Sequence, residues 1–412
     1  MNATRQDIPE TPRTGWAGRA ALVALSLSVG LAAGEGLLRA ADFSYYWALA
    51  RLPHPVTGWA PPAGAVAWQD VEGRALVRIN GSGLRGPERP QEKPSGSLRV
   101  AVLGDSFVEA VQVALEDTFP AVLERALSGC EALVGRPVEV INFGVSGYGT
   151  AQELLTFRSR VRAFRPDLVV LAFFPGNDLV ENVRALDADP LRPYFRLDQG
   201  QLTLDEGFRQ GVDYRRRVSP PGRAWSWLLR HSRLVQAAVK AWDLTRLRLG
   251  AGGGPRGPLD EPGVDERVYR EPGDPLWAEA WAVTEALVVR TAREVRAEGA
   301  DFLLATLSTG AQVHPDAWFR AEFARTHGSA DLLYPERRLL ALAEREGFPA
   351  VGLAGELAEL AALSGAWLHG FPNSLPGIGH WNRDGHRLAG ELLAHTVCRL
   401  GLGLRQGAGQ DR

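Results

Sequence analysis

The chain of 412 residues has only two cysteines, Cys130 and Cys398, one methionine, and two lysines among its 46 basic residues. Two cysteines are too few for a disulfide framework or for a zinc site built from cysteine ligands. A large net charge is absent as well, because 46 basic and 48 acidic residues leave a formal charge of -2. Such a chain has no basic field that would attract nucleic acid, and we therefore expect no nucleic-acid partner.

The sequence has no internal repeat, and its composition is that of a folded globular protein. Hydrophobic residues make up 45% of the chain and charged residues 23%. These fractions exclude a mostly disordered chain, a collagen-like repeat and a coiled coil. The length suits one large domain with insertions or two smaller domains.

One long stretch without charge lies near the N-terminus. Residues 20–34 carry no charged side chain, and they follow Arg13 and Arg19 and precede Glu35. The stretch is longer than most signal-peptide cores, and its extension to Leu38 reaches the roughly 20 residues that span a bilayer. Because positive charge precedes it, we expect the rest of the chain on the outer side of the membrane.

This stretch has three interpretations: an uncleaved signal anchor, a cleaved signal peptide, and a buried helix of the folded domain. The small residues at 32–34 would suit a signal peptidase. The buried helix is the least favoured, because nothing before Arg19 looks able to cover it. We expect residues 1–40 to hold a cytoplasmic N-terminus and a single-pass helix in the inner membrane, with the remaining chain exported to the periplasm.

From residue 98 onward, short apolar runs alternate with helical patterns, which indicates a parallel α/β sheet. The expected strands are 98–103, 138–142, 168–174, 302–307 and 348–353. The third run is apolar on both faces, as is typical of a central strand covered by helices on each side. We predict a three-layer α/β/α fold around a central parallel sheet of about five strands.

Helix signals lie between these strands. Thr118 and Pro120 open one helix as its cap and early-turn proline, and residues 128–129 close it. Residues 150–153 read as a capping box at the start of the next helix. Further helices are expected at 277–298, 335–345 and 384–400.

Two segments interrupt the alternation. Residues 41–95 are rich in proline and glycine, and we expect them to wrap or tether the domain that spans residues 96–405. Residues 181–275 form an insertion that is too long for a simple crossover helix. The sequence therefore favours one α/β domain with an insertion over two domains.

Within the insertion, residues 223–249 read as a basic amphipathic helix that carries Trp225, Trp227 and Trp242. Residues 250–273 then read as a flexible loop. The helix either lies on the membrane surface, packs against the α/β domain or forms a lid.

Three consecutive strands are followed by residues suited to acyl chemistry. Ser106 comes just after the first strand, a glycine-rich turn at 142–149 ends the second, and Asn177 follows the third. Carboxyl ends of parallel strands share one edge of a sheet, where ligands bind. A serine nucleophile, close backbone approach at glycine and an amide donor for an oxyanion would therefore converge. Each of the three is an ordinary turn when read alone.

A serine nucleophile needs a base. His380 precedes the last predicted helix and can return to the same edge of the sheet. His386 is its rival, but it lies within that helix, so we favour His380.

Read in order, these blocks resemble the SGNH/GDSL hydrolase superfamily over residues 99–400. They are Gly104-Asp105-Ser106, the run from Asn142 to Gly147, Gly176-Asn177-Asp178, and His380. The N-terminal anchor and residues 80–86 are similar to membrane-anchored bacterial members. The resemblance implies a flavodoxin-like SGNH fold and an esterase.

Carried over by motif, Ser106 is the nucleophile. By the same resemblance, the oxyanion hole would consist of the Ser106 and Gly147 N–H groups and the Asn177 side chain, and His380 would be the general base and later the acid. Members of the family often place Asp three residues before the histidine, where this chain has Gly377. Asp384 is close in sequence, but it is better explained as a charge that favours the helix dipole. A backbone carbonyl, a carboxylate from elsewhere or a Ser-His dyad are the alternatives.

The expected activity is hydrolysis or transfer of an acyl group through a Ser106 acyl-enzyme. The alternatives are an O-acetyltransferase or deacetylase acting on exported or envelope polysaccharide, and a non-catalytic binding or assembly protein. The expected partners are an acyl ester or acylated carbohydrate and, through the N-terminal helix, the membrane. We expect no metal and no cofactor, because the histidines form no ligand-spaced cluster and Gly104-Asp105-Ser106 lacks the lysine of a P-loop.

Overall fold

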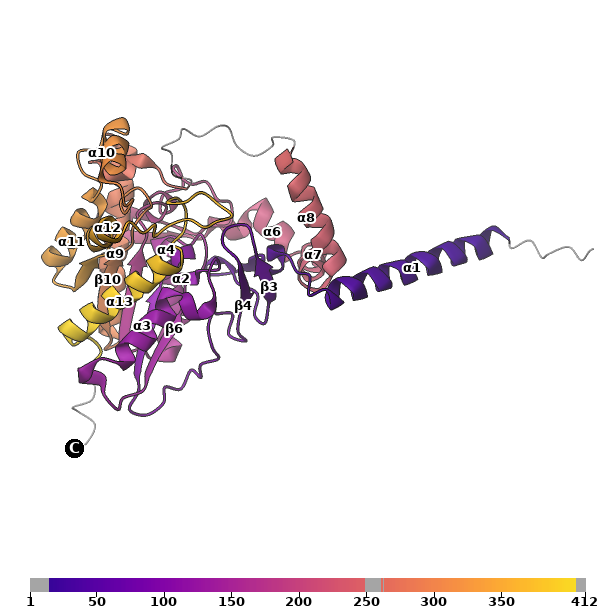
Figure 1. The fold of residues 1–412 in the computed structure, drawn as a ribbon, viewed down its shortest axis with the longest axis horizontal. Helices are drawn as coiled ribbons and strands as arrows, with labels where there is room; N and C mark the ends of the chain where they lie inside the picture. The colour runs from indigo at the N-terminus through magenta and orange to yellow at the C-terminus, as the bar shows by residue number, and fades with distance from the viewer. Residues whose placement is uncertain (1–14, 249–260, 262, 405–412) are drawn as a thin grey trace, which may run out of the picture.

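A five-stranded parallel sheet forms the centre of the computed structural model, which describes residues 15–248, 261 and 263–404 (Figure 1). Its strands lie in the order β11-β10-β7-β5-β6. They are β5 (Leu98–Leu103), β6 (Val138–Asn142), β7 (Leu168–Phe173), β10 (Asp301–Thr306) and β11 (Ala350–Gly352). All five predicted strands are present, and the ends of the last three differ by one or two residues, as strand and helix ends commonly do.

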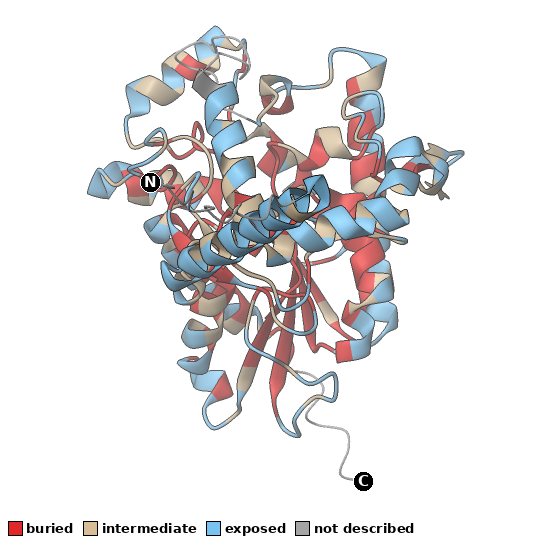
Figure 2. Cartoon of the chain, turned by 90° about the vertical axis from the view of Figure 1, so that its right-hand side faces the viewer, coloured by how far each residue is buried: buried red, intermediate tan, exposed pale blue. Residues whose placement is uncertain are grey.

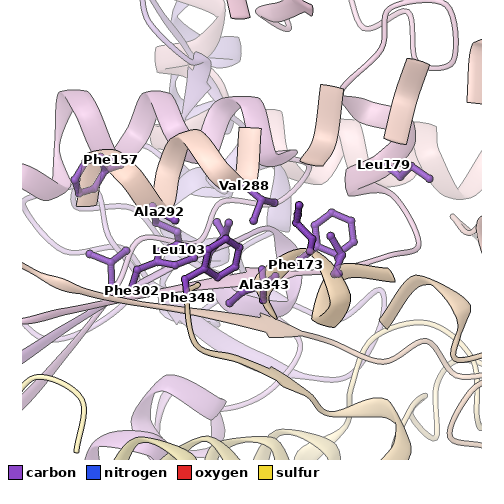
Figure 3. Packing of buried hydrophobic residues seen from close by; sticks show 14 of the residues in the cluster. Leu103, Phe157, Phe173, Leu179, Val288, Ala292, Phe302, Ala343 and Phe348 are labelled. Carbon is purple, nitrogen blue, oxygen red and sulfur yellow. The ribbon is translucent and has the colours of Figure 1, made fainter. Parts of the chain in front are cut away.

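Side chains of the central strands alternate between two buried faces, because successive residues of a strand point in opposite directions. Leu103 and Phe173 lie on one face, and Val102 and Ala172 on the other. The first face is covered by α4 (Thr150–Ser159), α9 (Pro275–Ala297) and α11 (Tyr334–Glu346), and Figure 3 shows part of its packing. The second is covered by α3 (Phe119–Ser128), α12 (Ala354–Ser364) and α13 (Arg383–Leu400). The predicted three-layer α/β/α fold is confirmed.

The two predicted helix starts have different outcomes. Thr118 caps α3, since its Oγ1 accepts the N–H of Ala121 at 3.4 Å. The capping box at 150–153 is wrong by one residue. Gly149 has the extended backbone of a cap, and its N–H donates to Oε1 of Gln152 at 3.4 Å. Thr150 is therefore the first residue of α4 rather than its cap.

The apolar N-terminal stretch forms α1 (Trp16–Ala40), and none of its residues is buried. This exposure contradicts the interpretation as a helix buried in the domain. Its 25 residues are long and apolar enough to cross a membrane, and a signal sequence would have the same character. Figure 1 shows α1 projecting away from the α/β domain.

Residues between α1 and β5 form two antiparallel strand pairs. The first joins β1 (Leu52–His54) to β2 (Gly58–Ala60), and the second joins β3 (Val66–Gln69) to β4 (Ala75–Arg78). Farther along the segment, the buried side chain of Arg85 donates from Nη1 to the carbonyl of Glu109 at 2.7 Å. The segment is thus packed against the start of the α/β domain.

Besides two short 3-10 helices, the described residues of the insertion form a further strand pair and three α-helices. They are β8 (Tyr194–Asp198), β9 (Gln201–Asp205), α6 (Val212–Val218), α7 (Pro220–His231) and α8 (Arg233–Arg248). The single helix predicted at 223–249 is therefore wrong. The chain is extended at Ser232, whose Oγ accepts the N–H of Val235 at 3.3 Å and so caps a second helix. Leu249 and half of the loop expected at 250–273 lie outside the described residues, and the described part contains the short helix η6 (Glu266–Tyr269).

The remaining helices of the described residues have ten residues or fewer, and those labelled η are 3-10 helices. They are η1 (Tyr46–Leu49), α2 (Ser106–Glu109), η2 (Leu115–Asp117), η3 (Glu131–Leu133), η4 (Val161–Phe164), α5 (Asp178–Glu181), η5 (Gly207–Gln210), η6 (Glu266–Tyr269) and α10 (Ala317–Thr326). The only two cysteines of the chain are joined: Cys130 follows α3 and Cys398 lies in the last turn of α13.

Candidate active site

Ser106 is the first residue of α2 and follows the end of β5 after Gly104 and Asp105. Oδ1 of Asp105 caps this helix by accepting the N–H of Phe107 at 2.8 Å. Nε2 of His380 lies 2.9 Å from Oγ of Ser106, which is hydrogen-bond distance for a nucleophile and its base. His386, the rival base, is instead buried in the core, where its Nδ1 accepts the N–H of Phe119 at 3.4 Å.

The carboxylate that contacts His380 comes from Glu72, in the turn between β3 and β4. Its Oε2 lies 2.5 Å from Nδ1 of His380, and its Oε1 accepts the backbone N–H of His380 at 2.9 Å. Burial raises the pKa of Glu72, but the hydrogen bonds and charge of His380 outweigh it and hold that pKa below its ordinary value. An ionised Glu72 thus holds the proton of His380 on Nδ1, which leaves Nε2 free to accept the proton of Ser106.

Two glycines shape the loop that carries His380. Gly379 has a φ of +89°, and a Cβ there would lie 2.3 Å from Oε1 of Glu72. Gly377 stands at the position where members of the SGNH/GDSL superfamily often have an aspartate. It has a φ of +77°, and a Cβ there would lie 2.3 Å from the ring of Trp367. The loop therefore has no space for an acid at 377, and it makes room for Glu72 instead.

Asn373 joins the turn that carries Glu72 to the loop that carries His380. Its Oδ1 accepts the N–H of Gly73 at 2.9 Å, and its Nδ2 donates to the carbonyl of Gly73 at 2.8 Å. Both bonds act on the residue next to Glu72, so they fix the position of its carboxylate relative to His380.

A second histidine, His369, contacts the backbone of the loop that carries His380. Burial lowers the pKa of His369 to about 4, so its ring is neutral at ordinary pH. Its Nδ1 lies 2.6 Å from the carbonyl of Gly379, and because a carbonyl only accepts, that nitrogen carries the proton. His369 thus acts on the backbone before His380 and does not touch Ser106.

The residues expected to form the oxyanion hole lie at neighbouring strand ends. Gly147 has a φ of +72°, which favours glycine, and it lines the same pocket as Ser106 and His380. Asn177 precedes α5, at the carboxyl end of β7, and its Oδ1 is buried with no hydrogen-bond partner among the described residues. Ser106, Gly147 and His380 therefore share one pocket, whereas Asn177 is not among its lining residues.

This pocket has a volume of about 650 Å³. Arg51 and Trp59 form part of its wall, and the Arg51 guanidinium lies 4.8 Å from the centre of the Trp59 ring. A Cβ at Gly147 would lie 2.8 Å from Nη2 of Arg51. Within the described residues, Arg51 forms no hydrogen bond or ion pair. A positive charge without a direct ion pair, but under the influence of the carboxylates of Glu109 and Glu181, thus lies beside the expected oxyanion hole.

Buried carboxylates lie behind the nucleophile. Burial raises the pKa of Asp105 to about 7, and burial also raises the pKa of Glu153 and of Asp178 well above the ordinary value. Neither oxygen of Glu153 has a hydrogen-bond partner in the part of the chain that is described. Burial therefore favours the neutral, protonated form of these three groups.

Within residues 15–248, 261 and 263–404, no group of three or more His, Cys, Asp or Glu side chains is placed to hold a metal ion. The sequence interpretation missed Glu72 and Arg51, both of which belong to the segment before β5. Nothing in the sequence distinguishes Glu72 from the other acidic residues of the chain.

No model of a known protein family matches the chain, and no curated protein does either. Solved structures do match. A G-D-S-L family protein from Desulfitobacterium hafniense is 11% identical, with 73% of this chain and 99% of the other covered and a TM-score of 0.33. An acetyl xylan esterase is 13% identical, with 74% and 99% covered and a TM-score of 0.36.

A catalytic mutant of the acetylxylan esterase Axe2 from Geobacillus stearothermophilus is 13% identical, with 75% of this chain and 95% of the other covered and a TM-score of 0.35. Likenesses at this level assign neither an activity nor a substrate to the chain. The chemistry of its site follows from the geometry of its own residues.

Proposed function

We propose that this chain is an exported, membrane-anchored serine esterase with a triad of Ser106, His380 and Glu72. The observation that carries the proposal is the unbroken line of contacts from Oγ of Ser106 through both ring nitrogens of His380 to Glu72. A nucleophile, a base and an orienting acid in this order define the triad by geometry rather than by sequence position.

The first half of the reaction forms an acyl-enzyme. Oγ of Ser106 attacks the ester carbonyl while Nε2 of His380 takes the hydroxyl proton, and Glu72 stabilises the imidazolium without accepting that proton. The tetrahedral intermediate then collapses. His380 returns the proton to the leaving alkoxide, and the acyl group stays on Ser106.

The second half repeats these steps with a new nucleophile. His380 removes a proton from water or from an acceptor hydroxyl, which attacks the acyl-enzyme and releases Ser106. Water gives a hydrolase, and a sugar hydroxyl gives an O-acyltransferase. The two fates share every residue of the triad, so the acceptor alone separates them.

The negative charge of the tetrahedral intermediate needs donors. The N–H of Ser106, at the start of α2, and the N–H of Gly147 are the expected pair, and the side-chain amide of Asn177 is the expected third donor. Arg51 adds a positive charge beside Gly147. We assign it a supporting electrostatic role rather than a direct contact with the oxyanion.

A serine-directed fluorophosphonate separates the esterase from a non-catalytic binding protein on the same fold. Full-length wild-type protein should be labelled at Ser106 and should hydrolyse short acyl esters, whereas Ser106→Ala should do neither. Ser128→Ala, at an exposed serine of α3, is the matched control. Unlabelled wild-type protein, or turnover by Ser106→Ala equal to wild type, would refute the proposal.

Acetylated oligosaccharide, given with and without an unacetylated acceptor, then separates the two enzymatic fates. Release of free acetate supports the esterase or deacetylase. Acetate found on the acceptor supports the O-acetyltransferase, the second candidate for an exported enzyme.

Export of the domain is supported by the disulfide as well as by α1. A structural disulfide persists in an oxidising compartment and is rare in the bacterial cytosol. Alkylation of the cellular protein without reductant should leave Cys130 and Cys398 unmodified, and prior reduction should expose both. Alkylation without reduction would place the domain in the cytoplasm.

A further inference from the structure

The domain-proximal end of α1 is attached to the start of α8 through one carboxylate. Glu35 accepts the backbone N–H of Arg233 and of Leu234, each at 3.0 Å, and the hydroxyl of Ser232 at 3.1 Å. Arg233 and Leu234 are the first residues of α8, so their N–H groups have no partner within the helix, and a negative charge is also favourable at this end. The position of α8 is therefore tied to that of the membrane helix.

The direction of α8 matters because α1 is proposed to cross the membrane. Figure 1 shows α8 running crosswise to α1 at the end of α1 that meets the domain. At about 1.5 Å per residue, the helix before Glu35 is close to the thickness of the hydrocarbon core, about 30 Å. The outer surface of the bilayer then lies near Glu35, and α8 runs along that surface.

Aromatic side chains are exposed on this pair of helices. Trp225 and Trp227 of α7 are 52% and 53% exposed, and Trp242 of α8 is 64% exposed. Figure 2 views the molecule from the side on which α1 projects. Tryptophan is enriched where membrane meets water, because its apolar ring and its polar N–H suit both phases.

Positive charge accompanies these tryptophans. From 211 to 246 only Asp213 and Asp243 are acidic, whereas basic residues are frequent. Three exposed arginines outside the catalytic pocket form no ion pair with any described residue: Arg215, Arg216 and Arg223. Unpaired arginines beside exposed tryptophans fit an anionic lipid surface better than a neutral one.

Two other residues of α8, Lys240 and Asp243, contact segments next to the active site. Lys240 pairs with Asp70 at 2.8 Å, two residues before Glu72. Asp243 accepts the indole N–H of Trp47 at 2.8 Å, and Trp47 lines the catalytic pocket. One helix thus contacts the anchor at its start and the active-site walls along its length.

We propose that α7 and α8 form an interfacial pair that rests on an anionic lipid surface, with Trp225, Trp227 and Trp242 at headgroup depth. In this arrangement α8 holds the catalytic pocket close to the bilayer, so the enzyme acts on substrate presented at the membrane surface. The inference rests on the proposed membrane-spanning role of α1 and does not depend on the esterase chemistry.

Quenching of tryptophan fluorescence by brominated acyl chains tests the proposal on the full chain in nanodiscs. The variant with Trp225→Phe, Trp227→Phe and Trp242→Phe should lose at least half of the quenchable emission of wild type. Trp318→Phe is the matched control, since Trp318 is 71% exposed but lies on α10, away from α1 (Figure 1). Wild-type quenching unchanged in the triple variant would overturn the proposal.

A second variant tests the charge. Replacing Arg215, Arg216 and Arg223 with Gln should abolish the increase in quenching that phosphatidylglycerol produces in wild type. Equal wild-type quenching with and without phosphatidylglycerol would overturn the anionic surface. The quenchable emission that Trp16→Phe removes measures the insertion of α1 separately. Ester turnover in the same nanodiscs measures whether the triad is active. A failure of the interface is thereby distinguished from a failure of the anchor or of the enzyme.

Discussion

Oε2 of Glu72 and Nδ1 of His380 lie 2.5 Å apart, although 308 residues separate them in the chain. The same carboxylate also accepts the backbone N–H of His380. Glu72 therefore orients the ring and the main chain of the base at once. The acid of this site comes from before the first strand of the central sheet, and the histidine from the loop before the last helix.

Glu72→Gln should lower kcat about 10²- to 10⁴-fold, because an amide neither stabilises the imidazolium nor enforces the tautomer. Steady-state kinetics on a soluble acyl ester measures this effect. Asp384→Asn, at the exposed acid that lies closest to His380 in sequence, should stay near wild type. The opposite ranking of the two variants would make Asp384 the acid.

Gly379→Ala should lose both activity and stability, because the new methyl group meets Oε1 of Glu72 as well as the strain of a positive φ. Gly365→Ala is a matched control: its φ is +69°, and a Cβ there meets nothing within 4 Å. Both should lose about 1–2 kcal/mol of unfolding free energy from backbone strain. Only Gly379→Ala should also lower kcat, and an equal kcat in both would show that Glu72 is not held by this contact.

Arg51→Gln should lower kcat about 10- to 100-fold, less than the loss of a direct oxyanion donor. The reason is the lost positive charge beside Gly147. Arg184→Gln is the control, since Arg184 also lies over an aromatic ring, that of Tyr194, but outside the pocket. A rise in KM at constant kcat would instead assign Arg51 to substrate binding.

Against the opposite contribution of His369, whose pKa burial lowers to about 4, the buried Asp105 and Glu153 should each remove stability as pH rises from about 4 to 7. Burial raises the pKa of both carboxyls, so the folded chain binds more protons at them than the unfolded chain in this range, and their contribution to the free energy of unfolding decreases with pH. Glu153→Gln should remove up to about 1.4 kcal/mol per pH unit of this decrease. Urea unfolding at several pH values measures the slope, and Glu131→Gln, at an exposed carboxylate, should leave it unchanged.

The α/β fold was predictable because each strand and helix leaves a local pattern. The apolar run at 168–174 could be read as a central strand because both of its faces are covered. Ser106 and Asn177 could be assigned to one edge of the sheet because parallel strands share the direction of their carboxyl ends. The break between α7 and α8 at Ser232 was not predictable in the same way, since the amphipathic pattern continues across it.

Periodicity and motif order by themselves predicted the parallel sheet, the apolar helix, and the contact between Ser106 and His380. Tertiary structure alone decided that Glu72 is the acid in contact with His380, that Cys130 meets Cys398, and that α8 joins the anchor to the pocket. The physical reason is the distance along the chain over which each interaction acts. Hydrophobic period and helix caps act within a few residues, whereas a contact across hundreds of residues exists only once the chain has packed.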